Sequence, residues 1–167
     1  YEISECLVGS EMCIRDRLTG REKKSDELYE ESYKKLENIR SEISKNPLNL
    51  KGTILYSTTP MMAFNSKSLS GQILSLLGIQ NIADNLVGDK PIISPEFLLK
   101  ENPDFLIGSM AIAKPEDVLN SNPVVKNIKA GQKGNLFIVD STKILRASPR
   151  IFEAVEELYF ELKEIGK

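Results

Sequence analysis

The pattern of apolar and polar positions begins with one long amphipathic helix. Over residues 21–45 the apolar side chains recur at the three- and four-residue intervals of a helix, leaving a single apolar stripe on a charged surface. We expect Ser25 to cap this helix and Asn46-Pro47 to end it, because the residue before a proline avoids the helical region. The residues that form the stripe are Leu28, Leu36, Ile39 and Ile43.

Short apolar runs then alternate with helical patterns. The runs are bounded by Gly, Pro, Asn or Asp, as is typical of buried strands, and occupy residues 53–56, 104–107 and 135–139. Helical patterns occupy residues 69–77, 94–100, 115–119, 123–127 and 148–164. Because strands that alternate with helices form parallel sheets covered on both faces, the sequence predicts an α/β fold. We expect a three-layer sandwich with a mostly parallel central sheet.

Composition removes several classes of function. The chain has 167 residues, a net charge of −2 and no histidine. Without a basic excess it has no electrostatic basis for binding nucleic acid, and without histidine it has neither Ser-His nor Cys-His catalysis nor imidazole ligands for a metal. No nucleophile, base and orienting group occur together. These absences argue against nucleophilic catalysis and imidazole-bound metals. Together with the resemblance described below, they lead us to expect no enzyme, no resident cofactor and no metal site.

The first seventeen residues do not fit the pattern that follows them. Residues 7–17, LVGSEMCIRDR, resemble the translation of a transposase adapter used to prepare sequencing libraries. The alternative is a natural disordered tail, which is common at chain termini. We treat residues 1–17 as an artefactual or disordered tail, so that Cys6 and Cys13 carry no information about redox compartment.

Two segments follow predicted strands and are candidates for binding. Residues 57–68 are rich in hydroxyl groups and carry Met61, Met62 and Phe64, and residues 141–150 carry Arg146. In open α/β sheets, ligands bind beyond the carboxyl ends of the strands. The apolar side chains either form an adaptable ligand surface or only cover the sheet edge. A glycine-rich phosphate cradle is absent from the first of these turns.

Several sequence pieces together resemble one transport family. They are TILYSTTPMM, SLSGQILSLLGIQNIAD, ISPEFLLKENPDFLI, VVKNIKAGQKGNLFIVD and ILRASPRIFEAVEELYFEL, in this order after the first helix. The order resembles the C-terminal lobe of the substrate-binding proteins of ABC importers for iron-siderophores, haem and cobalamin. In that family, two α/β lobes joined by one long helix hold the ligand between them.

The resemblance implies a domain division and a set of site residues. Residues 18–47 correspond to the interlobe helix and residues 48–167 to the C-terminal ligand-binding lobe, with the N-terminal lobe missing upstream. Glu96 corresponds to the surface glutamate that docks on the permease, and it also suits the first turn of its own helix. Cobalamin binders carry a tryptophan near residues 88–91, and this chain has no tryptophan. The ligand-binding positions carried over from the family are Tyr56, Met61, Met62, Phe64, Thr142 and Arg146.

The function that the resemblance implies is capture of an iron-siderophore, or a related iron or corrin complex, for delivery to an ABC importer. The expected partners are a metal-chelate ligand, the permease and the missing lobe, and the expected location is extracytoplasmic, periplasmic or lipoprotein-anchored. A cofactor-binding enzyme lobe and a sensory module that reuses the binding lobe remain alternatives. We also expect the apolar stripe of the first helix to be exposed where the absent lobe would pack.

Overall fold

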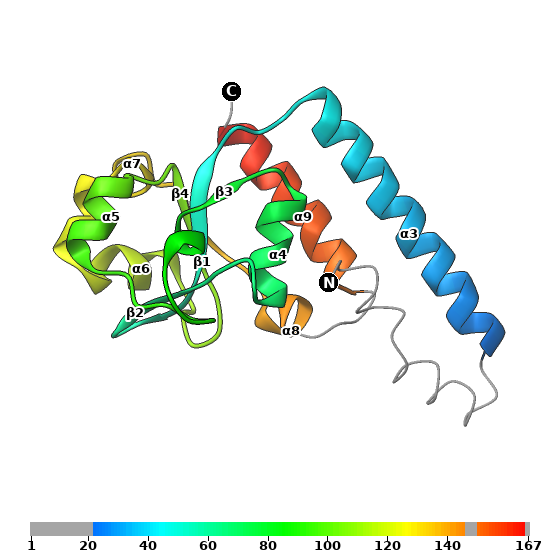
Figure 1. Cartoon of the computed structure of the whole chain (residues 1–167), viewed down its shortest axis with the longest axis horizontal. Helices are drawn as coiled ribbons and strands as arrows, with labels where there is room; N and C mark the ends of the chain where they lie inside the picture. Colours follow the sequence, from blue (N-terminus) through cyan, green and yellow to red (C-terminus); the bar gives the residue numbers. More distant parts are fainter. Residues whose placement is uncertain (1–21, 146–149, 166–167) are drawn as a thin grey trace.

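The computed structural model describes residues 22–145 and 150–165 (Figure 1). Helices and strands alternate along the chain as the sequence predicts. The elements are α3 (Glu22–Lys45), β1 (Lys51–Thr58), β2 (Met61–Phe64), α4 (Leu69–Leu76), β3 (Gln80–Asn81), η1 (Ile82–Asn85), α5 (Pro95–Glu101), β4 (Phe105–Gly108), α6 (Pro115–Ser121), η2 (Pro123–Asn127), α7 (Lys129–Gln132), β5 (Leu136–Ile138), α8 (Ser141–Ile144) and α9 (Arg150–Ile165).

The central sheet is mostly parallel. Its strand order is β2-β1-β4-β5, and β3 also pairs with β1. β1 runs parallel to β3 and β4, and β4 runs parallel to β5, with Ile107 aligned to both Ile54 and Phe137. Only β2 among these strands is antiparallel, forming a hairpin with β1. The predicted fold class is confirmed.

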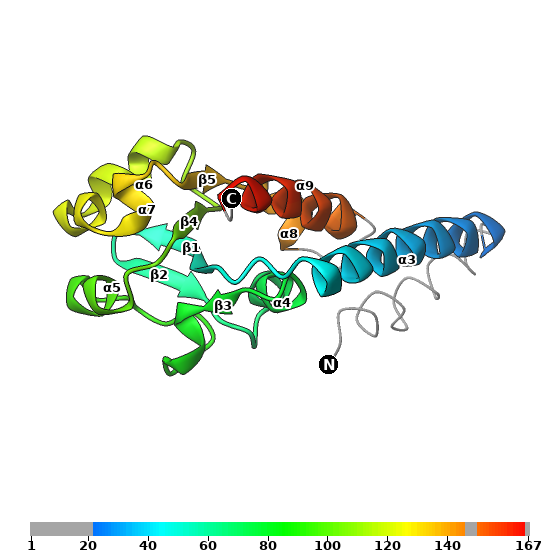
Figure 2. The same cartoon turned by 90° about the horizontal axis from the view of Figure 1, so that it is seen from above.

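Helices cover both faces of the sheet, so the lobe has three layers (Figure 2). Alternate residues of β1 face opposite cores: Ile54 lies in the cluster formed with α3, α4 and α9, and Leu55 lies in the cluster formed with α5, α6, η2 and α7. We call these sides the α9 face and the α6 face. Both strand residues are fully buried.

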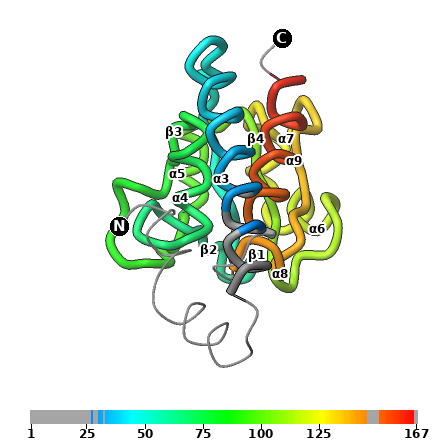
Figure 3. Tube along the Cα trace, turned by 90° about the vertical axis from the view of Figure 1, so that its right-hand side faces the viewer, coloured from blue at the N-terminus to red at the C-terminus, as the bar shows by residue number. Residues whose placement is uncertain are grey.

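The apolar stripe of α3 packs within the lobe rather than facing solvent. Leu36, Ile39 and Ile43 are buried in the core cluster that contains Val155 and Leu158 of α9. Figure 3 shows α3 and α9 running side by side. The expectation of an exposed stripe is wrong for these three residues, because α9 supplies the apolar surface they need. The side chain of Leu28 lies outside the described ones.

Helix boundaries agree with most of the signals in the sequence. Ser94 caps α5, where its Oγ accepts a hydrogen bond of 3.1 Å from the Phe97 amide, and Gly78 follows α4 with a φ of 70°. Asn46-Pro47 follows the end of α3 as predicted. Ser25 does not cap α3, because it lies inside the helix that includes Glu22. The residues between them are good helix formers and extend the helix upstream.

The sequence did not predict β2, β3, η1, α7 or α8, and two of these, β2 and α8, bear on the binding edge. The segment 57–68 was expected to be a loop, but Met61–Phe64 forms β2 and pairs with β1 in the register Ile54–Phe64 and Leu55–Ala63. The short helix α8 was also missed, although the Asp140 side chain caps it by accepting a hydrogen bond of 2.8 Å from the Thr142 amide. Both elements lie where strands end, so they shape the edge of the sheet that is described next.

Candidate functional site

The carboxyl ends of the parallel strands form one edge of the sheet. β1 ends at Thr58, β4 at Gly108 and β5 at Ile138. The segments that follow are the β1–β2 hairpin, the loop before α6, and α8. In Figure 1 this edge lies on the lower side of the lobe, toward which the amino end of α3 also extends. This carboxyl edge is where an open α/β sheet binds its ligands.

The hairpin presents an apolar surface on its α9 face. Met62 and Phe64 are two positions apart on β2 and therefore share a face, and Met62 pairs across the sheet edge with Ile92. The Tyr56 ring packs edge-on against Phe64 at 5.6 Å. Met62 and Tyr56 are half-buried, and Ile92 is 63% exposed. We call Tyr56, Met62, Phe64 and Ile92 the apolar shelf.

The ammonium group of Lys90 lies over this shelf. Lys90 Nζ is 4.2 Å from the centre of the Tyr56 ring and 5.8 Å from that of Phe64, which is cation–π geometry. The backbone that carries Lys90 is attached to the hairpin, since the Asn65 side-chain amide donates a hydrogen bond of 2.5 Å to the Gly88 carbonyl. The shelf therefore combines apolar area with a positive charge.

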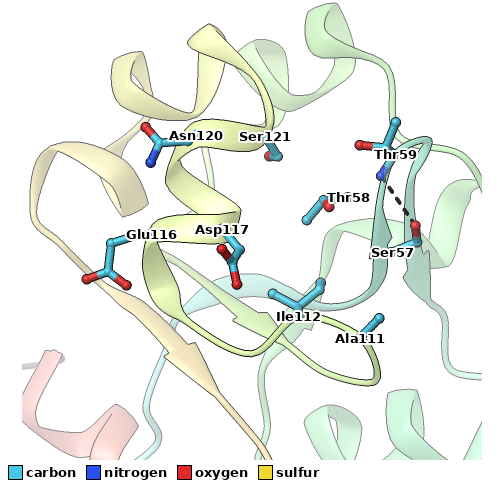
Figure 4. A pocket seen from close by; sticks show the side chains of 9 residues that line it. All are labelled: Ser57, Thr58, Thr59, Ala111, Ile112, Glu116, Asp117, Asn120 and Ser121. Carbon is cyan, nitrogen blue, oxygen red and sulfur yellow. Dashed lines mark hydrogen bonds between the residues drawn. The ribbon is translucent and has the colours of Figure 1, made fainter.

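The α6 face of the same hairpin borders an open hollow of about 540 Å³ (Figure 4). Thr58 and Asp117 lie on opposite walls of the hollow, on β1 and on α6. Its lining is rich in oxygen atoms and includes no basic side chain, which suits donor groups of a ligand. The lining residues are Ser57, Thr58, Thr59, Ala111, Ile112, Glu116, Asp117, Asn120 and Ser121.

Some of the polar groups in this hollow are already used by the fold. Asp117 Oδ2 accepts a hydrogen bond of 3.0 Å from the Lys114 amide at the start of α6, and Ser121 Oγ donates one of 2.6 Å to the Val118 carbonyl. Ser57 Oγ accepts from the Thr59 amide at 3.3 Å. These bonds fix the walls of the hollow and leave the Glu116 carboxylate exposed.

Short contacts join α8 to the rest of the α9 face. Ser70 Oγ, which is buried at the start of α4, donates a hydrogen bond of 3.2 Å to the Ile144 carbonyl of α8. Lys143 Nζ donates to both carboxylate oxygens of Glu157 at 2.6 and 2.9 Å, and these bonds raise the pKa of Lys143. Thr142 is exposed on α8. Arg146 lies outside the described residues.

Glu96 is exposed in the first turn of α5. A backbone N–H hydrogen bond lowers the pKa of its carboxyl group, and a hydrogen bond from Ser94 lowers it further. The preceding chain follows the outer edge of β2, where the Ile93 amide donates to the Met61 carbonyl at 2.9 Å. Glu96 therefore carries a negative charge just beyond the outer edge of the sheet.

The structure brings together only part of the predicted set. Tyr56, Met62 and Phe64 meet on one face of the hairpin, with Phe64 almost wholly buried. Met61 points to the opposite face and is buried in the α6-side core. Because side chains alternate between the two faces of a strand, Met61 lies on the face opposite Met62 and Phe64. The sequence analysis did not predict that residues 61–64 form a strand, so it could not separate these side chains.

Sequence reasoning missed three residues at this edge. Ile92 joins the shelf, and Lys90 lies over it, only because residues 91–93 pair with β2. No sequence motif indicates this pairing. Met110 follows β4 with a φ of 61° and is 45% exposed. A positive φ is uncommon for a residue with a side chain and draws attention to this loop.

Within residues 22–145 and 150–165, no group of three or more His, Cys, Asp or Glu side chains is placed to hold a metal ion. In the same part of the chain, no helix is both long enough and apolar enough to cross a bilayer.

Comparison with known proteins gives one family match. The sequence profile described as "Periplasmic binding protein" matches residues 17–142, which is more than half of the chain. No curated protein sequence matches the chain.

Solved structures with the same fold agree with this match. A possible iron-binding (periplasmic solute-binding) protein from Staphylococcus epidermidis ATCC 12228 superposes with a TM-score of 0.79 at 23% identity, over 96% of this chain and 62% of that protein. The periplasmic vitamin B12-binding protein BtuF of Vibrio cholerae gives 0.78 at 17% identity, over 99% of this chain and 63% of the other. The periplasmic heme-binding protein RhuT from Roseiflexus sp. RS-1 gives 0.78 at 16% identity, over 91% and 60%.

At these identities the structural likeness establishes the fold alone. The chain spans 60–63% of the length of these three proteins.

Proposed function

The chain belongs to the periplasmic binding protein family, and from this premise we propose that it is the C-terminal lobe of a receptor for an ABC importer. In this proposal the receptor captures an iron-siderophore, or a related iron or corrin complex, and delivers it to the permease. The family is one of binding proteins and not of enzymes, and it implies an extracytoplasmic location.

The observation that carries the proposal is the chemistry of the carboxyl edge. The apolar shelf and the oxygen-lined hollow lie on the two faces of one hairpin. Apolar surface supplies binding energy for a large chelate, while convergent polar groups orient it. Similar lobes occur in proteins described as binding iron, vitamin B12 and heme. A second lobe opposite this edge would complete the site.

The assignment of residues follows from that arrangement. Tyr56, Met62 and Phe64 would form the apolar wall of the site, with Met61 supporting it from the core behind. Thr142 on α8 would contact the ligand from the α9 side, and Arg146, a position carried over from the family pattern, would supply a charge to the ligand. We also propose that residues 18–47 join the two lobes and that residues 48–167 form the ligand-binding lobe.

Glu96 would contact the permease rather than the ligand. Its charge is exposed on α5, and α5 covers the α6 face at the outer edge of the sheet. An ionised carboxylate in such a position can pair with an arginine of a partner protein.

A titration tests the proposed function. The full-length gene product is titrated calorimetrically with ferric siderophores, haem and cobalamin. We expect one of these classes to bind tightly at one site per protein, and Arg146→Ala to weaken an anionic complex by about 1–3 kcal/mol, as for a hydrogen bond to a charged group. Absence of binding to every class would refute the receptor assignment, and an unchanged affinity in the variant would remove Arg146 from the site.

A further inference from the structure

We propose that Lys90 is a specificity-determining residue that selects ligands with an anionic group beside a flat apolar or aromatic body. This inference rests on the proposed function and names the ligand class of the same site. It starts from the position of one ammonium group over the apolar shelf.

Lys90 differs from most of the lysines whose contacts the structure gives. Lys51, Lys129 and Lys143 form ion pairs with Glu101, Asp104 and Glu157. Lys163 also lies over an aromatic ring, that of Tyr159 at 5.3 Å, but it does so on α9 and away from the apolar shelf. No carboxylate in the described part of the chain lies within ion-pair distance of Lys90, whose interactions are with the two aromatic rings. At an exposed site, such ring contacts stabilise a cation only weakly and leave its N–H donors available.

The backbone around Lys90 runs along the outer edge of β2, and hydrogen bonds to that edge hold it in place. On one side of Lys90, the Asn65 amide holds the Gly88 carbonyl. On the other side, the Pro91 carbonyl accepts a hydrogen bond of 3.1 Å from the Ala63 amide. The residue is therefore held between two attachments to β2 and its following turn, and binding a ligand requires little further ordering of the backbone.

The surroundings give the ammonium group its selectivity. It stands beside Tyr56 and Phe64, while the exposed face of Ile92 extends the same surface through its pairing with Met62. A flat ligand on this shelf would bury apolar area and bring an anionic oxygen to Lys90, forming a charge-assisted hydrogen bond. A ligand whose positive charge met Lys90 would be repelled.

The distribution of charge around the hairpin favours the same orientation of the bound ligand. Glu116 and Asp117 line the hollow on the α6 face, whereas Lys90 lies on the α9 face. An anionic group would therefore be repelled from the hollow and attracted to the shelf. Donor groups of the same ligand would fit the hollow.

Two ferric chelates of different charge provide the test. The full-length gene product is titrated with ferric enterobactin, a trianionic tris-catecholate with aromatic rings, and with ferrichrome, a neutral trihydroxamate. We expect preference for the tris-catecholate. We expect Lys90→Gln to weaken tris-catecholate binding about tenfold or more, as for loss of a charged hydrogen bond, and to change ferrichrome binding less than about twofold. Lys90→Arg should keep most of the preference, because it keeps the charge.

The matched control is Lys126→Gln. Lys126 is also exposed but lies on η2, in the helix layer on the opposite face of the sheet, and its replacement should leave both affinities unchanged. A preference for the neutral chelate, or equal loss of both affinities in Lys90→Gln, would overturn the inference while leaving the receptor function intact. Failure of the unmodified protein to bind any ferric chelate, haem or cobalamin would instead refute the proposed function, and the inference with it.

Discussion

The Asn65 side-chain amide and the Gly88 carbonyl are joined by a hydrogen bond of 2.5 Å that spans 23 positions of sequence. Asn65 is almost fully buried, and its Oδ1 also accepts a hydrogen bond of 3.1 Å from the Lys67 amide. One side chain thus holds both the turn after β2 and the segment leading to Lys90. The geometry of the shelf depends on this residue, although it does not itself face a ligand surface.

Asn65→Ala should therefore destabilise the lobe. The variant removes two part-buried hydrogen bonds, one to the Gly88 carbonyl and one from the Lys67 amide, and their loss costs about 1–3 kcal/mol together. The free energy of unfolding in urea measures this loss. The control is Asn85→Ala, since Asn85 is exposed in η1 and its replacement should change stability by no more than about 0.5 kcal/mol. Equal stability of the two variants would contradict the role given to Asn65.

Gly71→Ala should also destabilise the lobe, although alanine favours helices more than glycine does. A Cβ atom at position 71 would lie 1.9 Å from the Asn65 carbonyl oxygen, which is backbone and cannot easily move. We expect a loss of about 1–3 kcal/mol in the free energy of unfolding, as for overpacking of a core.

Ser75→Ala is the matched control for this substitution, because Ser75 is exposed on the same helix, α4. It should leave the stability unchanged or raise it slightly. A Gly71→Ala variant as stable as the unmodified chain would show that α4 can move away from the turn after β2.

The sequence predicted the strands and helices of the three layers more accurately than the structure of the carboxyl edge of the sheet. The buried strands and the α5 cap depend on local signals: compact apolar runs, and a serine that precedes Pro95 and Glu96. β2 has no alternating or β-branched pattern, and it is a strand only because β1 and residues 91–93 pair with its two sides. The position of Lys90 depends on the same long-range pairing.

The apolar stripe of α3 illustrates the same limit. Its period was readable, and it predicted a helix correctly. The surface that covers Leu36 and Ile39 is α9, more than 100 positions later in the chain, and periodicity alone does not identify a partner. Prediction of the candidate site met the same limit. The residue types in 57–68 indicated a binding surface, but the sequence did not show on which face of the hairpin each side chain lies.

Glu161→Gln should stabilise the lobe at neutral pH. Burial raises the pKa of the Glu161 carboxyl group, and the nearby charge of Glu157 raises it further. Because the pKa is higher in the folded state, the folded protein is most stable below the unfolded pKa, where the carboxyl group is protonated. This contribution to the free energy of unfolding is lost as the pH rises through the folded pKa. The glutamine of the variant cannot ionise, so the variant avoids this loss. Because the site is largely solvated, we expect a gain of only about a few tenths of a kcal/mol.

Urea unfolding at pH 7 and at about pH 3 or below measures this effect. The gain should be present at pH 7 and disappear at the lower pH, where both states hold the proton. Glu153→Gln is the control: it removes an acid from the first turn of the same helix and should lower stability slightly at pH 7. Opposite signs for the two variants are the expected result, and a loss of stability in Glu161→Gln would contradict the assignment.

Glu96→Lys should separate ligand binding from transport. Glu96 is exposed on α5, and its charge is stabilised by hydrogen bonds at the start of that helix. If it docks on the permease, reversing its charge should leave chelate affinity unchanged and reduce uptake by cells. Glu116→Lys is a comparison variant, because Glu116 has the equivalent place in the first turn of α6 and lines the hollow. Glu116→Lys should alter the affinity for the ligand. Undiminished uptake by cells that carry Glu96→Lys would refute docking by Glu96.

Amide hydrogen exchange with and without ligand tests the central claim most directly. The claim is that the carboxyl edge of the sheet binds the ligand. The measurement uses the full-length gene product and the ferric chelate, haem or cobalamin that binds it most tightly. We expect ligand to slow exchange in peptides covering residues 56–64 and 88–92, and to leave residues 129–136 at the opposite edge unchanged. Slower exchange at residues 129–136 with none at the hairpin would contradict the account.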